Sequence, residues 1–274
     1  MSRRRELARR IAALTDIRGI LGAMKNLAVM ETRILKDFLE TQRRMVAGIE
    51  VASADFFAWY GDALPQPGKI RDVIVVIGSE QGFCGDFNET IVQAGQRELG
   101  ESGWVVVGRR ISSKLEGEAR VARAVPGATV TDEVPAALRR LADELDRLQP
   151  PEDGSPRSLS AFYHCAATGE IRLHRLLPLP HLPPPSHYTN APETNLQPAE
   201  FLSELTRHCL YAALHEILYS SLMSENQQRL AHMDRALQRL DKDAAHLKLV
   251  FNAQRQEEII EEIEVLLLSA DAVS

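Results

Sequence analysis

The last part of the chain, from Ala199 to Ser274, contains neither proline nor glycine. Its apolar residues recur every seven positions in two series that are offset by three residues. The series are Met223, Leu230, Leu237, Ala244 and Phe251, and Met233, Leu240 and Leu247. This spacing is the a/d pattern of a coiled coil over about four heptads. An unbroken helix of this length would reach roughly 110 Å, which is longer than an ordinary domain.

Residues 1–60 show a weaker form of the same pattern, with no proline and few glycines. The series spaced by seven is Leu7, Leu14, Leu21, Ala28 and Leu35, and the residues between its members are Ile11, Ile17, Met24 and Phe38. Each terminal segment therefore has one apolar stripe that needs a cover. We predict that residues 1–60 and 199–274 pack on each other as an antiparallel pair.

Charged residues gather at the two ends of the chain. Arginines crowd the start at positions 3, 4, 5, 9 and 10, and glutamates crowd the end at positions 257, 258, 261, 262 and 264. Each set has the wrong sign for its own helix dipole. An antiparallel pair would bring the two sets together, whereas the alternative is two solvated faces. Asn226, Gln254 and Glu261 interrupt the stripe at seam positions, which indicates a coil shaped for a partner.

All the prolines and most of the glycines fall between these segments, where short apolar runs alternate with helical patterns. We expect strands at 73–77, 104–107, 121–125, 159–165 and 171–177, and helices at 88–99, 109–118 and 136–148. The alternation predicts a mostly parallel sheet. The predicted fold is α/β: a long antiparallel coiled coil of the N- and C-terminal helices (1–60 and 199–274) with a Rossmann-like α/β domain over 69–195.

Composition excludes several classes of protein. The formal net charge of −6 argues against a nucleic-acid binder. Three widely spaced cysteines argue against a disulfide framework and against a zinc cluster, and they favour a reducing compartment. We expect no membrane-spanning segment and no secretory signal. The histidines show no metal-ligand spacing, and even His208 and His215, seven residues apart, are typical of solvated or packed side chains.

The middle of the chain carries a glycine-rich loop, residues 78–88, with the sequence GSEQGFCGDFN. A phosphate-binding P-loop needs four residues between its glycines, followed by a lysine. Here the spacing is one residue short, no lysine follows, and Glu80 and Asp86 would repel a phosphate. The pattern favours a tight strand-to-helix connection, with Asp86 or Asn88 capping the helix. Cys84 is either a nucleophile or, as we favour, a packed thiol.

A proline-rich stretch, PLPHLPPPSH at residues 178–187, resembles a polyproline ligand. We favour an ordered, extended crossover that leads from the sheet back to the last helix.

Three stretches carry a resemblance to a known family. Arg10-Ile11 and Ile20–Met24 are similar to its R-I…K-I-T-x-A-M run, and residues 79–88 to its S-x-R-G-L-C-G-x-x-N loop. Near the end, Ser224-Glu225…Arg229 and residues 252–262 match its S-E…R-M and N-x-x-R-Q-x-x-I-T-x-E patterns. In this respect the chain resembles the gamma subunit of the F-type ATP synthase, the central rotor shaft, from one end to the other.

The resemblance implies a non-catalytic subunit that binds no cofactor and no metal. Its coil would turn inside a ring of alpha and beta subunits, while the α/β domain rests on the c-ring beside the epsilon subunit. Ion flow through the membrane ring would thereby drive ATP synthesis, or run in reverse. The resemblance implies a peripheral location on the cytoplasmic face of a bacterial inner membrane, reached through the c-ring only, and no nucleic-acid partner.

The same resemblance implies which residues contact the catalytic head or the rotor. They are Arg10, Ile20, Met24, Gln81, Gly82, Cys84, Gly85, Asn252, Arg255, Gln256, Ile259 and Glu262. Gly19, Gln81, Asp86 and Ile260 depart from the family's pattern and indicate a divergent branch, for which the alternate bacterial F-type ATPase is one hypothesis. Two alternatives are a nucleotide-binding α/β enzyme with a coiled-coil arm and a structural coiled-coil adaptor.

Overall fold

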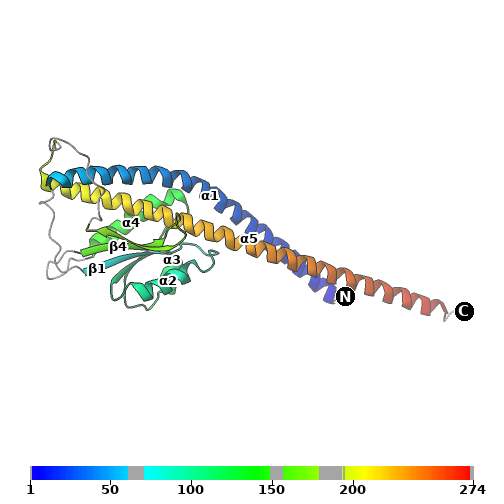
Figure 1. Ribbon diagram of the computed structural model, residues 1–274. Helices are drawn as coiled ribbons and strands as arrows, with labels where there is room; N and C mark the ends of the chain where they lie inside the picture. The colour runs from blue at the N-terminus through cyan, green and yellow to red at the C-terminus, as the bar shows by residue number, and fades with distance from the viewer. Residues whose placement is uncertain (1, 61–70, 149–156, 179–192, 194, 272–274) are drawn as a thin grey trace. The chain divides into compact units, whose positions relative to one another are not determined.

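Figure 1 shows the computed structural model, which describes residues 2–60, 71–148, 157–178, 193 and 195–271. The chain divides into two compact units. The coil unit comprises Met1–Ala28 and Leu230–Ser274, and the sheet unit comprises Val29–Arg229. The two terminal helices contribute to both units, since α1 spans Ser2–Tyr60 and α5 spans Pro198–Asp271.

Both helices predicted from the apolar repeats are therefore present. Helix α5 begins at Pro198, one residue before the expected start. Proline suits the first turn because its φ angle is already helical and its missing N–H would have no partner there. Among the described residues, no helix combines the length and the apolar character that crossing a bilayer requires. The domain boundaries at 69 and 195 stay predictions.

Within each unit α1 and α5 run antiparallel, as predicted. In the coil unit Arg4 pairs with Glu258 at 2.6 Å, and further along α1 Lys25 pairs with Asp234 at 2.5 Å. In the sheet unit the side-chain amide of Gln42 donates to the carbonyl of Ala212 at 3.2 Å. In both units, partners further along α1 lie earlier along α5. The expected attraction between terminal arginines and glutamates is confirmed for Arg4 and Glu258.

The apolar seam differs in detail from the prediction. Leu7, Leu21, Ala28 and Leu35 are buried, as the repeat of seven requires. Ile17 and Phe38 were placed between them, but both are 45% exposed. The seam advances in alternating steps of three and four residues, so Leu39 is buried, whereas Phe38 stays partly exposed and contacts the ring of Tyr219 on α5, with ring centroids 5.6 Å apart.

The sheet unit contains a five-stranded sheet with the order β3-β2-β1-β4-β5. The strands are β1 (Arg71–Ile77), β2 (Gly103–Val107), β3 (Val121–Val125), β4 (Arg157–His164) and β5 (Ile171–Leu177). The first four pair in parallel, and β5 pairs with β4 in the antiparallel direction. The expected mostly parallel sheet is confirmed.

Helices cover both faces of this sheet. Val75 and Ile77 point into one core with α4 (Val134–Arg147), α1 and α5. Ile74 and Val76 point into a second core with α2 (Phe87–Glu98) and α3 (Arg109–Lys114). Figure 1 shows these two layers on opposite sides of the strands. Because both faces are buried, the central strands are continuous apolar runs rather than alternating ones.

Helix α3 is shorter than the predicted helix at 109–118. It ends at Lys114, where the N–H of Leu115 bonds back to the carbonyls of Ile111 and Ser112. Gly117 then takes a φ of +86°, a conformation that ends a helix. The polyproline stretch and the crossover expected there lie almost entirely outside the described residues.

Removal of a buried leucine tests this two-layer core. Leu138 of α4 is fully buried, whereas Leu173 of β5 is 54% exposed. We expect Leu138→Ala to lower the free energy of unfolding by about 2–5 kcal/mol, because it leaves a cavity in the core. The matched control Leu173→Ala should change it by less than about 0.5 kcal/mol. Urea unfolding followed by circular dichroism and by fluorescence of buried Trp104 measures both, and equal effects would contradict this account.

Candidate functional site

The glycine-rich loop leaves the carboxyl end of β1 and turns at once against α3. The N–H of Gly78 donates to the carbonyl of Val107 at 2.9 Å, which extends the pairing of β1 with β2 by one residue. A Cβ atom on Gly78 would lie 2.5 Å from Cβ of Ile111 and 2.7 Å from Oδ1 of Asn88. Glycine is therefore required here for close packing of the loop on α3, and no phosphate is needed to explain it.

Ser79, Cys84 and Asn88 form a buried polar cluster inside the loop. Asn88 accepts a hydrogen bond from the N–H of Ser79 at 2.9 Å and donates one to its hydroxyl at 2.7 Å. The Cys84 thiol donates to the same hydroxyl at 3.4 Å. The prediction that Asp86 or Asn88 caps the helix is wrong. Asp86 stands at the N-cap of α2 but its side chain makes no capping hydrogen bond, and the side chain of Asn88 bonds to Ser79 instead.

Glu80 is one of the acidic residues that we expected to repel a phosphate. In the structure it binds the backbone of two neighbouring segments. Its buried carboxylate accepts hydrogen bonds from the N–H of Arg109 at 2.9 Å and of Gly127 at 2.8 Å, and it pairs with the Arg109 side chain. Burial raises the pKa of Glu80, but these donors and the Arg109 charge outweigh it and lower the pKa overall. A fixed negative charge thus occupies the position that a phosphate would need.

The thiol of Cys84 is buried, so the predicted partner contact at this position cannot involve its side chain in this conformation. Burial raises its pKa, with nearby Glu225 adding to the rise, and a neutral thiol is a poor nucleophile. This supports the packed-thiol interpretation.

The outer rim of the loop consists of Gln81, Phe83 and Gly85, which are all exposed. Phe83 is 54% exposed and has a φ of +63°, which is rare for a residue with a side chain. Such strained backbone concentrates at functional sites. Phe83 was absent from the predicted contacts. The sequence could have indicated it only as a large apolar residue that stands between two small ones, Gly82 and Cys84.

Helix α5 contacts this loop through a group of three polar residues. Arg229 bonds to Asn226 at 2.7 Å, pairs with Glu225, and directs Nε to the carbonyl of Gly82 at 3.4 Å. Glu225 accepts hydrogen bonds from backbone N–H groups of the loop, at Glu80 and Gln81. We call Glu225, Asn226 and Arg229 the loop latch.

The sequence motif S-E…R carried the family resemblance, but its role in the latch was missed. Asn226 was interpreted as an interruption of the seam, whereas it orients Arg229. Burial raises the pKa of Glu225 to about 7, against the lowering by Arg229 and by the loop N–H groups. Without Arg229 and the loop N–H groups the pKa would lie higher still, so these partners favour the charged form of the carboxylate.

The other predicted contacts belong to the coil unit. Arg10, Ile20, Asn252, Arg255, Gln256, Ile259 and Glu262 are exposed, and Met24 is half-buried. Arg10 pairs with Glu6 of its own helix at 2.7 Å. The predicted site residues therefore form two groups, one on the coil unit and one in the loop of the sheet unit. Both groups stay predictions as partner contacts.

Methyl groups added to two loop glycines test the packing of the loop. Gly78→Ala should cost about 1–3 kcal/mol of unfolding free energy, since the new Cβ would collide with Ile111 and Asn88. Gly82→Ala is the matched control, because the nearest atoms to its Cβ belong to the Arg110 side chain, at 3.6 Å or more. Thermal and urea unfolding compare the two variants, and a Gly78→Ala protein as stable as the control would refute the proposed packing.

The loop latch can be tested by removing one charge or both. Both side chains of the Glu225–Arg229 pair are almost fully buried. Arg229→Met should lower the unfolding free energy by about 3–5 kcal/mol, because it leaves a carboxylate buried without its partner. The double variant Glu225→Gln, Arg229→Met should recover a large part of that loss. If the double variant is as unstable as the sum of the single variants, the pair does not act as a unit.

Comparison with known proteins finds relatives that match nearly the whole chain. The ATP synthase gamma chain of Geotalea uraniireducens (strain Rf4) is 23% identical, with 100% of this chain and 99% of that relative covered. The gamma chain of Clostridium botulinum (strain Langeland) is 24% identical, with 97% and 96% covered.

Two solved structures show the same fold. A chain of the Euglena gracilis mitochondrial ATP synthase rotor superposes with a TM-score of 0.65 at 12% identity, covering 94% of this chain and 99% of that one. A chain of the central stalk and c-ring of the Tetrahymena thermophila mitochondrial ATP synthase gives a TM-score of 0.60 at 16% identity, with 79% and 99% covered. A family model described as ATP synthase matches residues 3–273, and the chain therefore belongs to the ATP synthase family.

Proposed function

We propose that this chain is the gamma subunit of an F-type ATP synthase, the central shaft that couples ion flow through a membrane ring to ATP synthesis or hydrolysis. The observation that carries the proposal is the likeness to bacterial gamma chains, which extends over 97% to 100% of the chain. An enzyme with an added coiled-coil arm would share only one part with such relatives.

In this role the coil unit turns inside a ring of alpha and beta subunits. The exposed apolar side chains near the end of α5 support a contact of that kind. They are Ile259, Ile260, Ile263, Val265 and Leu266. Exposed apolar groups at this density are typical of a surface that another protein covers. Ile20 on α1 is also exposed and would contribute to the same bearing surface.

A shaft must transmit torque from its foot to its coil without slipping. The loop latch fixes α5 to the glycine loop through the bond from Arg229 to the carbonyl of Gly82 and the bonds from loop N–H groups to Glu225, while the ion pair within α5 holds these two side chains in place. Helix α5 then continues unbroken to Asp271. We infer that turning the sheet unit turns α5 with it, because twisting one against the other would break the bonds of Glu225 and Arg229 to the loop backbone.

The sheet unit would rest on the c-ring together with the epsilon subunit, so that the chain is peripheral to the cytoplasmic face of a bacterial inner membrane. The chain itself would be non-catalytic. The Glu80 carboxylate, which is satisfied by Arg109 and by the N–H of Gly127, supports the absence of a nucleotide from the glycine loop.

Co-purification with a tagged chain from its own cells tests this function. We expect ATPase alpha and beta subunits to accompany the wild-type chain. Leu237→Pro should reduce their recovery at least tenfold, because proline removes a hydrogen bond from α5 and costs about 3 kcal/mol or more. Leu237→Ala is the control, since it keeps the helix intact.

Absence of alpha and beta subunits from the wild-type sample would overturn the assignment to a rotor. Saturable micromolar binding of ATP to the isolated chain would instead support the nucleotide-binding enzyme. Equal recovery with Leu237→Pro would show that an unbroken α5 is not needed for assembly.

A further inference from the structure

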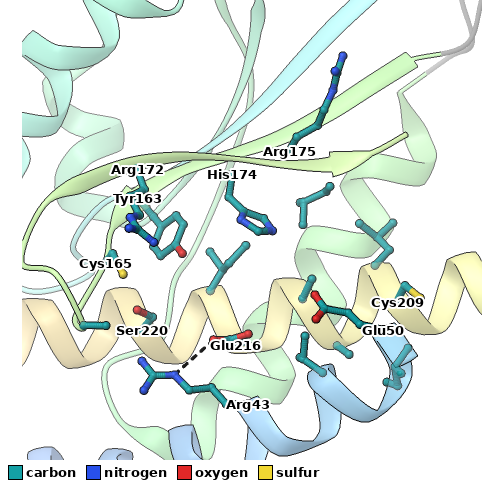
Figure 2. A pocket seen from close by; sticks show the side chains of 18 residues that line it. Arg43, Glu50, Tyr163, Cys165, Arg172, His174, Arg175, Cys209, Glu216 and Ser220 are labelled. Atoms are coloured by element: carbon teal, nitrogen blue, oxygen red, sulfur yellow. Dashed lines mark ion pairs between the residues drawn. The ribbon is translucent and has the colours of Figure 1, made fainter. Parts of the chain in front are cut away.

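A cavity of about 290 Å³ lies within the sheet unit, where α1 and α5 pass the β4–β5 hairpin (Figure 2). This volume is near the lower end of the range for small-molecule sites, about 300–1,000 Å³. The cavity is separate from the glycine loop and from the loop latch, since none of their residues lines it. It has no part in the proposed function.

One side of the cavity is apolar. Val46 and Ile49 of α1 face Leu210, Ala213 and Ile217 of α5 across it. These side chains offer a surface on which a hydrocarbon body of matching size would exclude water. The apolar side gives binding energy but does not select a head group.

The hairpin end of the cavity gathers hydrogen-bond donors. Figure 2 shows Tyr163, Cys165 and Arg172 close together at this end. Burial raises the pKa of Tyr163 to about 12, so its hydroxyl stays protonated and able to donate. The N–H of Ala166 donates to the hydroxyl of Ser220 at 3.1 Å, which ties the hairpin turn to α5 beside these groups.

The same end stabilises negative charge, as the Cys165 thiol shows. Burial alone raises its pKa, but hydrogen bonds from Thr168 and Ala167, together with the charge of Arg172, outweigh burial and lower the pKa overall. Backbone N–H groups of a tight turn that converge in this way form an anion-binding concavity.

Arg172 and Arg175 are the arginines of the lining that make no ion pair among the described residues, and both are exposed. Arg43 lies 3.5 Å from Glu216, so these two neutralise each other. Within the described part of the chain Arg172 makes no ion pair. In Figure 2 Glu50 lies at the opposite end, near Cys209, and the Arg175 side chain, which also lines the cavity, extends away from Arg172 and Tyr163. A negative ligand is therefore attracted to the Arg172 end and repelled from the other.

We propose that this cavity binds a small organic carboxylate, with its carboxylate at Arg172 and Tyr163 and its apolar body against Val46, Ile49 and Leu210. The shared chemistry is one negative head on a compact apolar body. A medium-length acyl chain and an aromatic acid both have this chemistry, and they represent two sources of ligand, the membrane and metabolism.

Calorimetric titration of the full-length chain tests the proposal with decanoate and 1-naphthoate, each below the concentration at which it forms micelles. Decylamine is the cationic counterpart of decanoate. We expect one saturable site for at least one of the two acids and at least tenfold weaker binding of the amine. Stronger binding of decanoate would favour an acyl source, and stronger binding of naphthoate an aromatic one. Absence of saturable binding by either acid, or equal binding of the amine, would overturn the proposal.

A charge variant and its control locate the head group. Arg172→Gln should weaken binding of the better acid at least fivefold, because it removes the cation that lies beside Tyr163. Arg139→Gln is the matched control, an exposed arginine of α4 outside the cavity lining. Circular dichroism confirms that both variants fold. Equal affinities of the two variants would place the acid elsewhere and refute the site.

Alkylation of Cys165 locates the bound acid independently. Iodoacetamide modification, mapped by mass spectrometry of peptides, should slow at least fivefold at Cys165 when the acid is saturating. The rate at Cys165 in a sample without acid provides the reference. Saturable binding that leaves the Cys165 rate unchanged would also refute the site.

Discussion

Neither terminal helix can bury its apolar stripe without the other, and the rest of the structure depends on this. Leu7, Leu21, Ala28 and Leu35 are buried although a single helix in water would expose them. Their partners lie near the other end of the sequence, so the intervening residues must fold in a way that returns α5 beside α1. The parallel sheet between them does this, and its core is covered in part by the same two helices.

The loop latch gives the packing of α5 on the sheet unit one specific register. Apolar seams tolerate sliding by one heptad, because the next repeat presents similar side chains. The bonds between α5 and the loop tolerate no such shift, since moving Glu225 and Arg229 together along the loop would leave its N–H groups and the Gly82 carbonyl without partners. The latch therefore fixes the register of α5 on the sheet unit, which a torque-transmitting shaft requires.

The glycine loop shows how one local pattern supports two different uses. Glycines after a buried strand allow close approach of a phosphate, but they equally allow close approach of α3, as at Gly78. The carboxylate of Glu80 decides between them, because it accepts the backbone hydrogen bonds that an anion would otherwise receive. The same principle of converging donors reappears at the β4–β5 turn, where the donors surround a thiol beside an open cavity.

The sequence by itself determined the two terminal helices, the antiparallel packing and the mostly parallel sheet, because periodicity and the placement of proline and glycine are local properties. It also excluded a P-loop by spacing and charge. Only the tertiary structure decided the exact seam at Leu39, the true partner of Asn88, the buried Glu225–Arg229 pair and the cavity at Arg172. Each of these depends on which individual side chains from distant segments meet, and the periodicity of a segment does not specify those side-chain contacts.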